Sequence, residues 1–183
     1  MSYLCRAVLG TISALSPARA TTFEQLEVDQ NKIIALAVPR VGSTPQMIVL
    51  EQIKSDKACW KESGSHPVNV EPLLLNFDFT GICGRSTDSN GYSIRMANQD
   101  LALLYSLSIV RRDSQLVLIG TSNTNRNAPA MVIGRTHGIS SGVTKILMEP
   151  GWRFTKRTFN GQTLDHVYLT NDKAAQSIQS VKH

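Results

Sequence analysis

The stretch WRFTKRTFNGQTLDHVYLT (residues 152–170) carries the clearest structural signal in the chain. Its two halves, Trp152–Phe159 and Gln162–Thr170, alternate in polarity and flank the dipeptide Asn160-Gly161. A type I′ turn prefers this dipeptide because both of its central residues need positive φ. We therefore expect two antiparallel strands joined by a two-residue turn, with a shift of phase near Thr158 or Phe159.

Short runs of β-favouring residues continue on the N-terminal side of this hairpin, from Thr21 onward. Two further strand pairs are predicted, Lys32–Pro39 with Gln46–Ile53 and Leu103–Arg111 with Leu116–Thr121. Single strands are expected at Leu73–Phe79, Gly91–Met96, Ala130–Gly134 and Gly142–Met148. Helix is expected only in the N-terminal segment, in a turn near Asn98–Tyr105 and in the polar tail Asp172–Val181.

This pattern predicts a mainly β fold with little helix. Residues 21–183 are expected to form one antiparallel β-sandwich or barrel-like domain, with a polar tail from about residue 172. A chain of 183 residues that is 42% apolar and 18% charged suits one globular domain with a sizeable core. No apolar run reaches the roughly 20 residues of a membrane-spanning helix. The nucleotide-binding patterns GxxxxGK[ST] and GxGxxG are also missing from the sequence.

Residues 1–20 have the pattern of a cleavable signal peptide. Arg6 precedes an apolar stretch from Ala7 to Leu15, and Ala18-Arg19-Ala20 supplies the small-x-small pattern of a cleavage site. The alternative is a frayed N-terminal helix on a cytosolic domain. Cleavage after Ala20 removes two arginines and lowers the net charge from +5 to +3. So small a net charge argues against a dedicated nucleic-acid binder.

Cleavage would also remove Cys5 and leave Cys59 and Cys83. Two cysteines in an exported chain predict one disulfide. The alternatives are two buried free thiols, or an activated thiol at Cys83 within GICGR. The chain has no CxxC motif and no Cys/His cluster, so no zinc site is expected.

Several long motifs resemble a cyanobacterial family of exported or surface proteins, the domain of unknown function DUF3747. They are PLLLNFDFTGICGRSTDSNGYSIR (72–95), NQDLALLYSL (98–107), IGRTHG (133–138) and PGWRFTKRTFNGQTLDHVYLT (150–170). The opening FEQLEVDQNKIIALAVP (23–39) and the pair Cys59-Trp60 fit the family as well. The resemblance implies a cyanobacterial origin, an export signal and a function that is not assigned, and it supplies no catalytic residues.

The most suggestive ligand surface is the basic and aromatic strand of the C-terminal hairpin. Trp152, or Tyr168 across the hairpin, is a candidate for stacking on a sugar ring. Arg153 and Arg157 are candidates for pairing with an anionic polysaccharide or an acidic partner. The alternative is an ordinary half-buried strand, in which aromatic and charged residues alternate anyway.

Acidic residues offer weaker candidates. Asp88-Ser89-Asn90-Gly91 is similar to the opening of a calcium loop, with Asp88 and Asn90 as ligands, but a tight turn favours the same residues. Glycosidase chemistry needs two facing carboxylates. Candidate pairs are Asp78 with Asp100, and Glu51 with Glu71.

Nucleophilic catalysis has little support in the sequence. Ser140 and Ser141 follow His137, but the nucleophile-elbow pattern GxSxG is missing. His66 and His166 are expected to be a loop residue and a strand residue rather than a catalytic dyad.

Taken together, the sequence favours an exported envelope or surface protein that acts as a non-enzymatic binding or structural module. Its expected partner is a polysaccharide, the cell wall or an envelope protein; no cofactor, nucleic acid or membrane span is expected. One alternative is a subunit of a larger envelope assembly, and another is an envelope hydrolase using acids near Asp78, Asp88 and Asp100. The compartment is left open among periplasm, thylakoid lumen, cell surface and medium.

Overall fold

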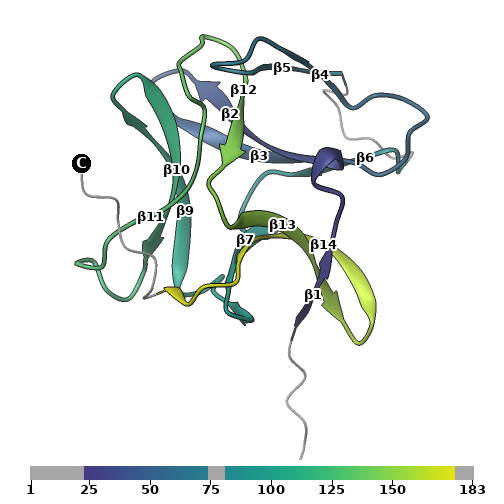
Figure 1. Ribbon diagram of the computed structural model, residues 1–183, viewed down its shortest axis with the longest axis vertical. Coiled ribbons are helices and arrows are strands. Elements are labelled where there is room, and N and C mark those ends of the chain that lie inside the picture. Colours follow the sequence, from purple (N-terminus) through teal and green to yellow (C-terminus); the bar gives the residue numbers. More distant parts are fainter. Residues whose placement is uncertain (1–22, 74–80, 176–183) are drawn as a thin grey trace, which may run out of the picture.

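A computed structural model of the protein describes residues 23–73 and 81–175. Within these residues the regular secondary structure is almost entirely β-strand (Figure 1). The elements are β1 (Glu24–Glu27), η1 (Gln30–Lys32), β2 (Ile33–Arg40), β3 (Ser43–Gln52), β4 (Trp60–Ser63), β5 (Asn69–Pro72), β6 (Cys83–Ser86), β7 (Tyr92–Met96), β8 (Gln99–Asp100), β9 (Tyr105–Arg112), β10 (Gln115–Ser122), β11 (Met131–Arg135), β12 (Thr144–Met148), β13 (Trp152–Phe159) and β14 (Gln162–Asn171).

The strands form two sheets that pack face to face as a sandwich-like fold. The small sheet has the order β1-β13-β14-β7-β8, and the large, curled sheet has the order β6-β3-β2-β12-β11-β10-β9. The hairpin β4–β5 joins the large sheet beside β12. The mainly β, sandwich-like fold class predicted from the sequence is therefore confirmed.

The C-terminal hairpin has the predicted form. β13 and β14 are antiparallel, and Asn160 and Gly161 between them have φ values of 49° and 76°. Their register shifts between Lys156 and Thr158, which is where the alternation in the sequence changes phase. The predicted strand pairs β2–β3 and β9–β10 are likewise confirmed as antiparallel pairs.

One pairing departs from the antiparallel arrangement expected from the sequence. β14 pairs with β7 in parallel, with Val167 opposite Tyr92 and Asn171 opposite Met96, whereas the other pairings in the described residues are antiparallel. This parallel pairing places β14 between β13 and β7 in the small sheet. Both faces of β14 are buried from His166 onward, so one strand supports the core on one side and a polar layer on the other.

The main core lies between the two sheets. Its central side chains come from β2, β3, β7, β11 and β14 and include Ala35, Val49, Ile94, Ile133 and Leu169. A second apolar cluster on the opposite face of β2 and β3 contains Ile34, Leu36, Ile48 and Leu50, and Val70 of β5 covers it. β2 and β3 are thus buried on both faces, as their continuous apolar runs require.

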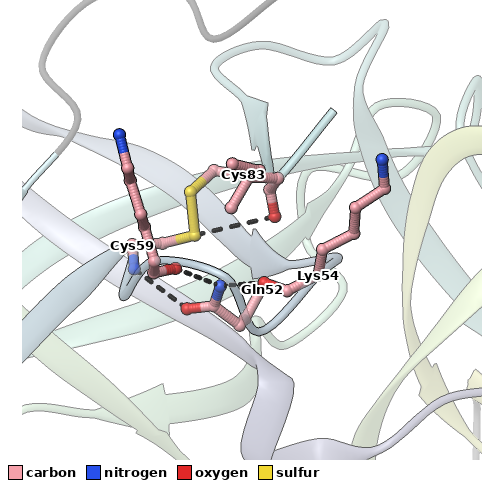
Figure 2. Close-up of a disulfide and its surroundings, with 6 residues drawn as sticks. Gln52, Lys54, Cys59 and Cys83 are labelled. Carbon is pink, nitrogen blue, oxygen red and sulfur yellow. Dashed lines mark hydrogen bonds between the residues drawn. A yellow bond between two sulfur atoms is a disulfide. The ribbon is translucent and has the colours of Figure 1, made fainter. Parts of the chain in front are cut away.

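The disulfide predicted between Cys59 and Cys83 is present, and it links the start of the β4–β5 region to strand β6 (Figure 2). The Cα atoms of the two cysteines are 5.9 Å apart. Gln52 holds the intervening turn: its Oε1 accepts from the backbone N–H of Cys59 at 2.9 Å, and its Nε2 donates to the carbonyls of Lys54 and Lys57. The hydrogen bonds of Gln52 and the disulfide therefore both fix the loop between β3 and β4.

Three predictions concern residues that the structure does not describe. These are the signal segment 1–20 with Cys5, most of the strand expected at Leu73–Phe79 with Asp78, and the end of the polar tail. The turn expected near Asn98–Tyr105 is present, since the backbone N–H groups of Leu104 and Tyr105 both donate to the carbonyl of Leu101 at 3.0 Å.

Removal of the disulfide should destabilise the fold markedly. The paired substitution Cys59→Ala/Cys83→Ala opens a loop whose ends are 24 positions apart in sequence. We expect the free energy of unfolding to fall by about 3 kcal/mol because the unfolded chain regains that conformational freedom. Guanidinium denaturation measures this loss, and a reductant should have no further effect on the double variant. An unchanged unfolding midpoint would contradict the stabilising role.

Candidate functional site

The outer face of the small sheet, the face turned away from the main core, carries polar side chains that are nevertheless buried or partly buried. They come from β7, β8, β13 and β14, and we call them the Asp100 network: Ser93, Arg95, Asp100, Thr155, Arg157, His166, Tyr168 and Thr170. Tyr168 has 0% of its surface exposed and Ser93 only 5%. Buried polar groups are stable only when they are hydrogen-bonded, so their partners determine the local structure.

The carboxylate of Asp100 is the centre of this network. Its Oδ2 accepts from Arg157 Nη2 at 2.6 Å and from the hydroxyl of Tyr168 at 2.8 Å. Its Oδ1 accepts from the backbone N–H of Ala102 at 3.0 Å, and the hydroxyl of Ser93 lies 3.4 Å away. One acidic side chain on the short edge strand β8 thereby connects β7, β13 and β14.

The ring of Tyr168 lies between two guanidinium groups. Arg157 Cζ is 4.9 Å and Arg95 Cζ is 5.2 Å from the ring centroid, and Arg157 Nε also donates to the Tyr168 hydroxyl at 2.6 Å. Burial raises the pKa of the Tyr168 phenol, the hydrogen bond with Asp100 raises it further, and the hydrogen bond with Arg157 opposes this. Tyr168 is therefore a neutral structural ring at physiological pH.

The N-terminal strand is attached to the same network. Arg95 Nε donates to Gln25 Oε1 at 2.8 Å, and its Nη1 donates to the carbonyl of Phe23 at 3.2 Å. The Phe23 ring lies beneath the Arg157 guanidinium, with 4.5 Å between Cζ and the ring centroid. β1 thus extends the small sheet through side chains as well as through its backbone pairing with β13.

His166 and Ser93 meet at the opposite end of the network. Ser93 Oγ and His166 Nε2 are 2.8 Å apart, and His166 Nδ1 lies 2.8 Å from the carbonyl oxygen of Asn90. Burial, the largest cause, lowers the pKa of His166; nearby Arg157 and Lys156 also lower it, while the Asn90 hydrogen bond and Asp100 oppose the shift. The imidazole is therefore neutral in the folded protein at pH 7.

A pocket of about 260 Å³ lies on the other side of β14, between β3, β6, β13 and β14. Inside it Lys156 Nζ bonds Glu51 Oε2 at 2.7 Å, and Asp165 and Cys83 form part of its wall. Gly84 stands opposite Glu51, and a Cβ added there would lie 3.1 Å from Glu51 Oε2. We call this cavity the Glu51 pocket; its other lining residues are Val49, Ile53, Gly81, Arg85, Ser86 and Val167.

The four residues expected to form a ligand platform do not lie open on one surface. Trp152 is 7% exposed in the core and Tyr168 is buried on the opposite face, so neither presents a free ring for stacking. The cations are occupied as well: Arg153 contacts Glu27 and Asp172, and Arg157 contacts Asp100. The hydrogen bonds that Arg153 donates to Glu27, and then those to Asp172, raise the pKa of Arg153. Anion binding at Arg153 and Arg157 stays a prediction, and it would have to displace these carboxylates.

The acidic candidates are dispersed. Asp88 Oδ1 accepts from the backbone N–H of Asn90 at 2.9 Å. This hydrogen bond is typical of a tight turn, which was the alternative to a calcium loop. Glu51 lies on β3 in the Glu51 pocket, while Glu71 lies on β5 opposite Lys61. Within the described residues, no group of three or more His, Cys, Asp or Glu side chains has an arrangement that could hold a metal ion.

The structure places His66 in a loop and His166 in a strand, as expected from the sequence. His66 and His137 are loop residues whose rings pack edge to face, with centroids 5.8 Å apart. His166 is a strand residue, as expected, but it contacts Ser93, which sequence reasoning missed. The two residues are 73 positions apart, so no local motif could have paired them.

A family model matches most of the chain. The family model described as "Protein of unknown function (DUF3747)" matches residues 1–174. No curated protein and no solved structure matches the chain. Among residues 23–73 and 81–175, no helix has the length and apolar character needed to cross a membrane.

Acidification should destabilise the protein through His166. Because the pKa of His166 is lowered in the folded state, the unfolded chain takes up a proton first as the pH falls below about 6.5. The free energy of unfolding should therefore decrease between pH 7.5 and pH 5.5. Urea denaturation should show that His166→Gln reduces this dependence, whereas His66→Gln in an exposed loop keeps it. Equal pH dependence in the wild type and His166→Gln would argue against this origin.

Proposed function

We propose that this chain, which belongs to the family "Protein of unknown function (DUF3747)", is an exported cyanobacterial protein that binds a glycan of the cell envelope and leaves its glycosidic bonds intact. The observation that carries the proposal is the Glu51 pocket, a hollow lined by both charged and apolar side chains, with Cys83 of the disulfide in its wall. Two inferences support it, one about the compartment and one about the ligand.

The export inference rests on the N-terminal sequence and on the disulfide. Residues 1–20 combine Arg6, the apolar stretch from Ala7 to Leu15 and the small residues at Ala18 and Ala20. The Cys59–Cys83 bond agrees with an oxidising compartment, because disulfides persist outside the cytosol and are rare within it.

The ligand inference rests on the chemistry of the pocket wall. Glu51 and Asp165 offer acceptors for sugar hydroxyl groups, and Lys156 offers a donor. Val49, Ile53 and Val167 supply apolar surface for the C–H faces of a sugar ring. The wall carries both acidic and basic groups, which suits a neutral polar ligand better than a strongly charged one. The cavity of about 260 Å³ has room for one sugar residue rather than a long oligosaccharide.

Rigid walls make the pocket suitable for recognition. Glu51 is paired with Gly84 across β3 and β6, and Lys156 is held by its ion pair with Glu51. The disulfide fixes Cys83 beside Gly84. A preformed pocket loses little conformational entropy when a ligand binds.

One alternative has an observation in its favour. β1 is an edge strand of the small sheet, and its Leu26 is 49% exposed. Such an edge can pair with a strand from another protein. This would make the chain a subunit of a larger envelope assembly. The hydrolase hypothesis is weaker at the pocket, because the Glu51 carboxylate is already paired with Lys156.

Glycan binding should be lost when the pocket is filled. We expect N-acetylglucosamine oligomers and neutral glucose oligomers, titrated into ¹⁵N-labelled protein, to shift amide resonances of β3, β6, β13 and β14. Gly84→Val should abolish these shifts because its side chain enters the space beside Glu51. Gly142→Val is the matched control, since a Cβ at that site meets only Ser140 Oγ, at 3.6 Å. Shifts that survive in Gly84→Val would remove the pocket from the proposal.

Export should be visible in the mass of the native protein. Protein isolated from its source cells should lack residues 1–20, and Cys59 and Cys83 should resist alkylation until they are reduced. Mass spectrometry with and without reductant measures both features. A full-length chain with three alkylated thiols would overturn the export inference while leaving the pocket test unaffected.

A further inference from the structure

The Ser93 hydroxyl and the His166 imidazole form a buried pair that glycan binding does not use. Ser93 Oγ and His166 Nε2 are 2.8 Å apart, and both residues are less than one-tenth exposed. They lie on neighbouring strands, β7 and β14, on the face of the small sheet opposite Val167 and the Glu51 pocket. A serine and a histidine at this distance are the first two members of a nucleophile–base arrangement.

The carbonyl of Asn90 fixes which ring nitrogen carries the hydrogen. A carbonyl oxygen can only accept, so His166 Nδ1, which is 2.8 Å from it, is the donor. In the neutral ring the hydrogen is then on Nδ1, and Nε2 has a free lone pair directed at Ser93. The Ser93 hydroxyl therefore donates to Nε2, which is the direction of proton transfer that activates a serine.

The turn that carries Asn90 is rigid, and this keeps the imidazole oriented. Asp88 Oδ1 accepts from the Asn90 N–H at 2.9 Å, and the Asp88 carbonyl accepts from the Gly91 N–H at 2.9 Å. The Gly91 carbonyl accepts from the N–H of Val167, next to His166. A Cβ at Gly91 would lie 2.7 Å from Ser86 Cβ, so the turn packs closely against its neighbours.

A second pocket, of about 250 Å³, opens onto Ser93. Its volume suits a short acyl chain such as acetyl or butyryl. The side chains of Ser89 and Tyr105 carry hydroxyl groups that can donate to a developing oxyanion. The remaining lining residues are Tyr92, Ala102, Ser106 and Leu107.

We propose that Ser93 and His166 catalyse acyl transfer from short-chain esters bound in this second pocket. Ser93 Oγ attacks the ester carbonyl while its proton passes to His166 Nε2, and the C–O bond to the alcohol breaks. The alcohol leaves with the proton from His166, and an acyl-Ser93 ester remains. Water then attacks this ester, gives one proton to His166 and releases the carboxylic acid as Ser93 regains its hydrogen.

The charges around His166 are compatible with this cycle. Asp100, whose Oδ1 is 3.4 Å from Ser93 Oγ, favours the positive imidazolium that forms when the ring takes a proton. Arg157 and Lys156 act in the opposite sense. The 2.8 Å contact with Nε2 is the shorter of the two that Ser93 makes, so the hydroxyl hydrogen is directed to the histidine.

A fluorophosphonate probe tests the proposal, because it labels activated serines irrespective of the natural ester. Intact full-length protein is incubated with the probe at pH 7.5, and the adduct is mapped by peptide mass spectrometry. We expect one adduct, on Ser93, and hydrolysis of p-nitrophenyl acetate that the adduct blocks. Ser93→Ala should lose both signals, and His166→Gln should slow labelling about 100-fold or more. Ser140→Ala is the matched control and should label like the wild type.

The test remains decisive if Ser93→Ala folds poorly, because the adduct site is mapped on the unaltered protein. Ser93→Cys gives a second readout: its thiol should react with iodoacetamide faster than the thiol of Ser93→Cys/His166→Gln. Failure to label Ser93, or labelling of His166→Gln at the wild-type rate, would overturn the proposal. Neither result depends on the Glu51 pocket, so loss of glycan binding and loss of acyl transfer are separate outcomes.

Discussion

The hydrogen bonds that the Asp100 carboxylate accepts are the constraint on which the outer face of the small sheet depends. β14 is buried on both faces, and only its inner face is apolar. Tyr168 and Arg157 on the outer face would be costly to bury without partners, and Asp100 supplies an acceptor to both. One carboxylate on a two-residue strand therefore supplies the acceptors that allow this polar layer to be covered.

The same strand separates two chemically different sites. On the inner side of β14, Val167 and its neighbour Asp165 line the Glu51 pocket beside the disulfide. On the outer side, His166 contacts Ser93 at the edge of the second pocket. Because side chains alternate along a strand, three consecutive residues can serve both sites without interfering. The rigidity of β14, which is paired on both edges, makes each site preformed.

Much of the fold could be predicted because its signals are local. Asn160-Gly161 specified the turn, alternation specified the strands on either side, and two cysteines in an exported-type chain specified the disulfide. The parallel pairing of β7 with β14 could not be predicted, since it joins residues 75 positions apart, such as Tyr92 and Val167. Alternation also showed which residues share a face but not whether that face is covered. This is why Trp152 and Tyr168 were expected at a surface and are buried.

The candidate functional residues could also be identified from local sequence, but their roles depend on residues far away in the chain. Asp88 and Asn90 were singled out as a weak calcium motif, and the structure gives them a turn whose carbonyl orients His166. The residue types indicated a turn, but the contact of the Asn90 carbonyl with His166 could not be predicted because His166 lies 76 positions away. The charged strand of the hairpin looked like a ligand surface because its acidic partners, Glu27, Asp172 and Asp100, are not in that strand.

The protonation state of His166 tests the assignment of the Ser93 and His166 pair most directly, since the contacts of the ring with the Asn90 carbonyl and with Ser93 both require one tautomer. Long-range ¹H–¹⁵N correlation spectra of the histidine side chains at pH 7 distinguish a protonated from an unprotonated ring nitrogen. We predict a neutral His166 ring with the hydrogen on Nδ1 and no hydrogen on Nε2. A ring protonated on Nε2, or averaged between the two tautomers, would contradict it.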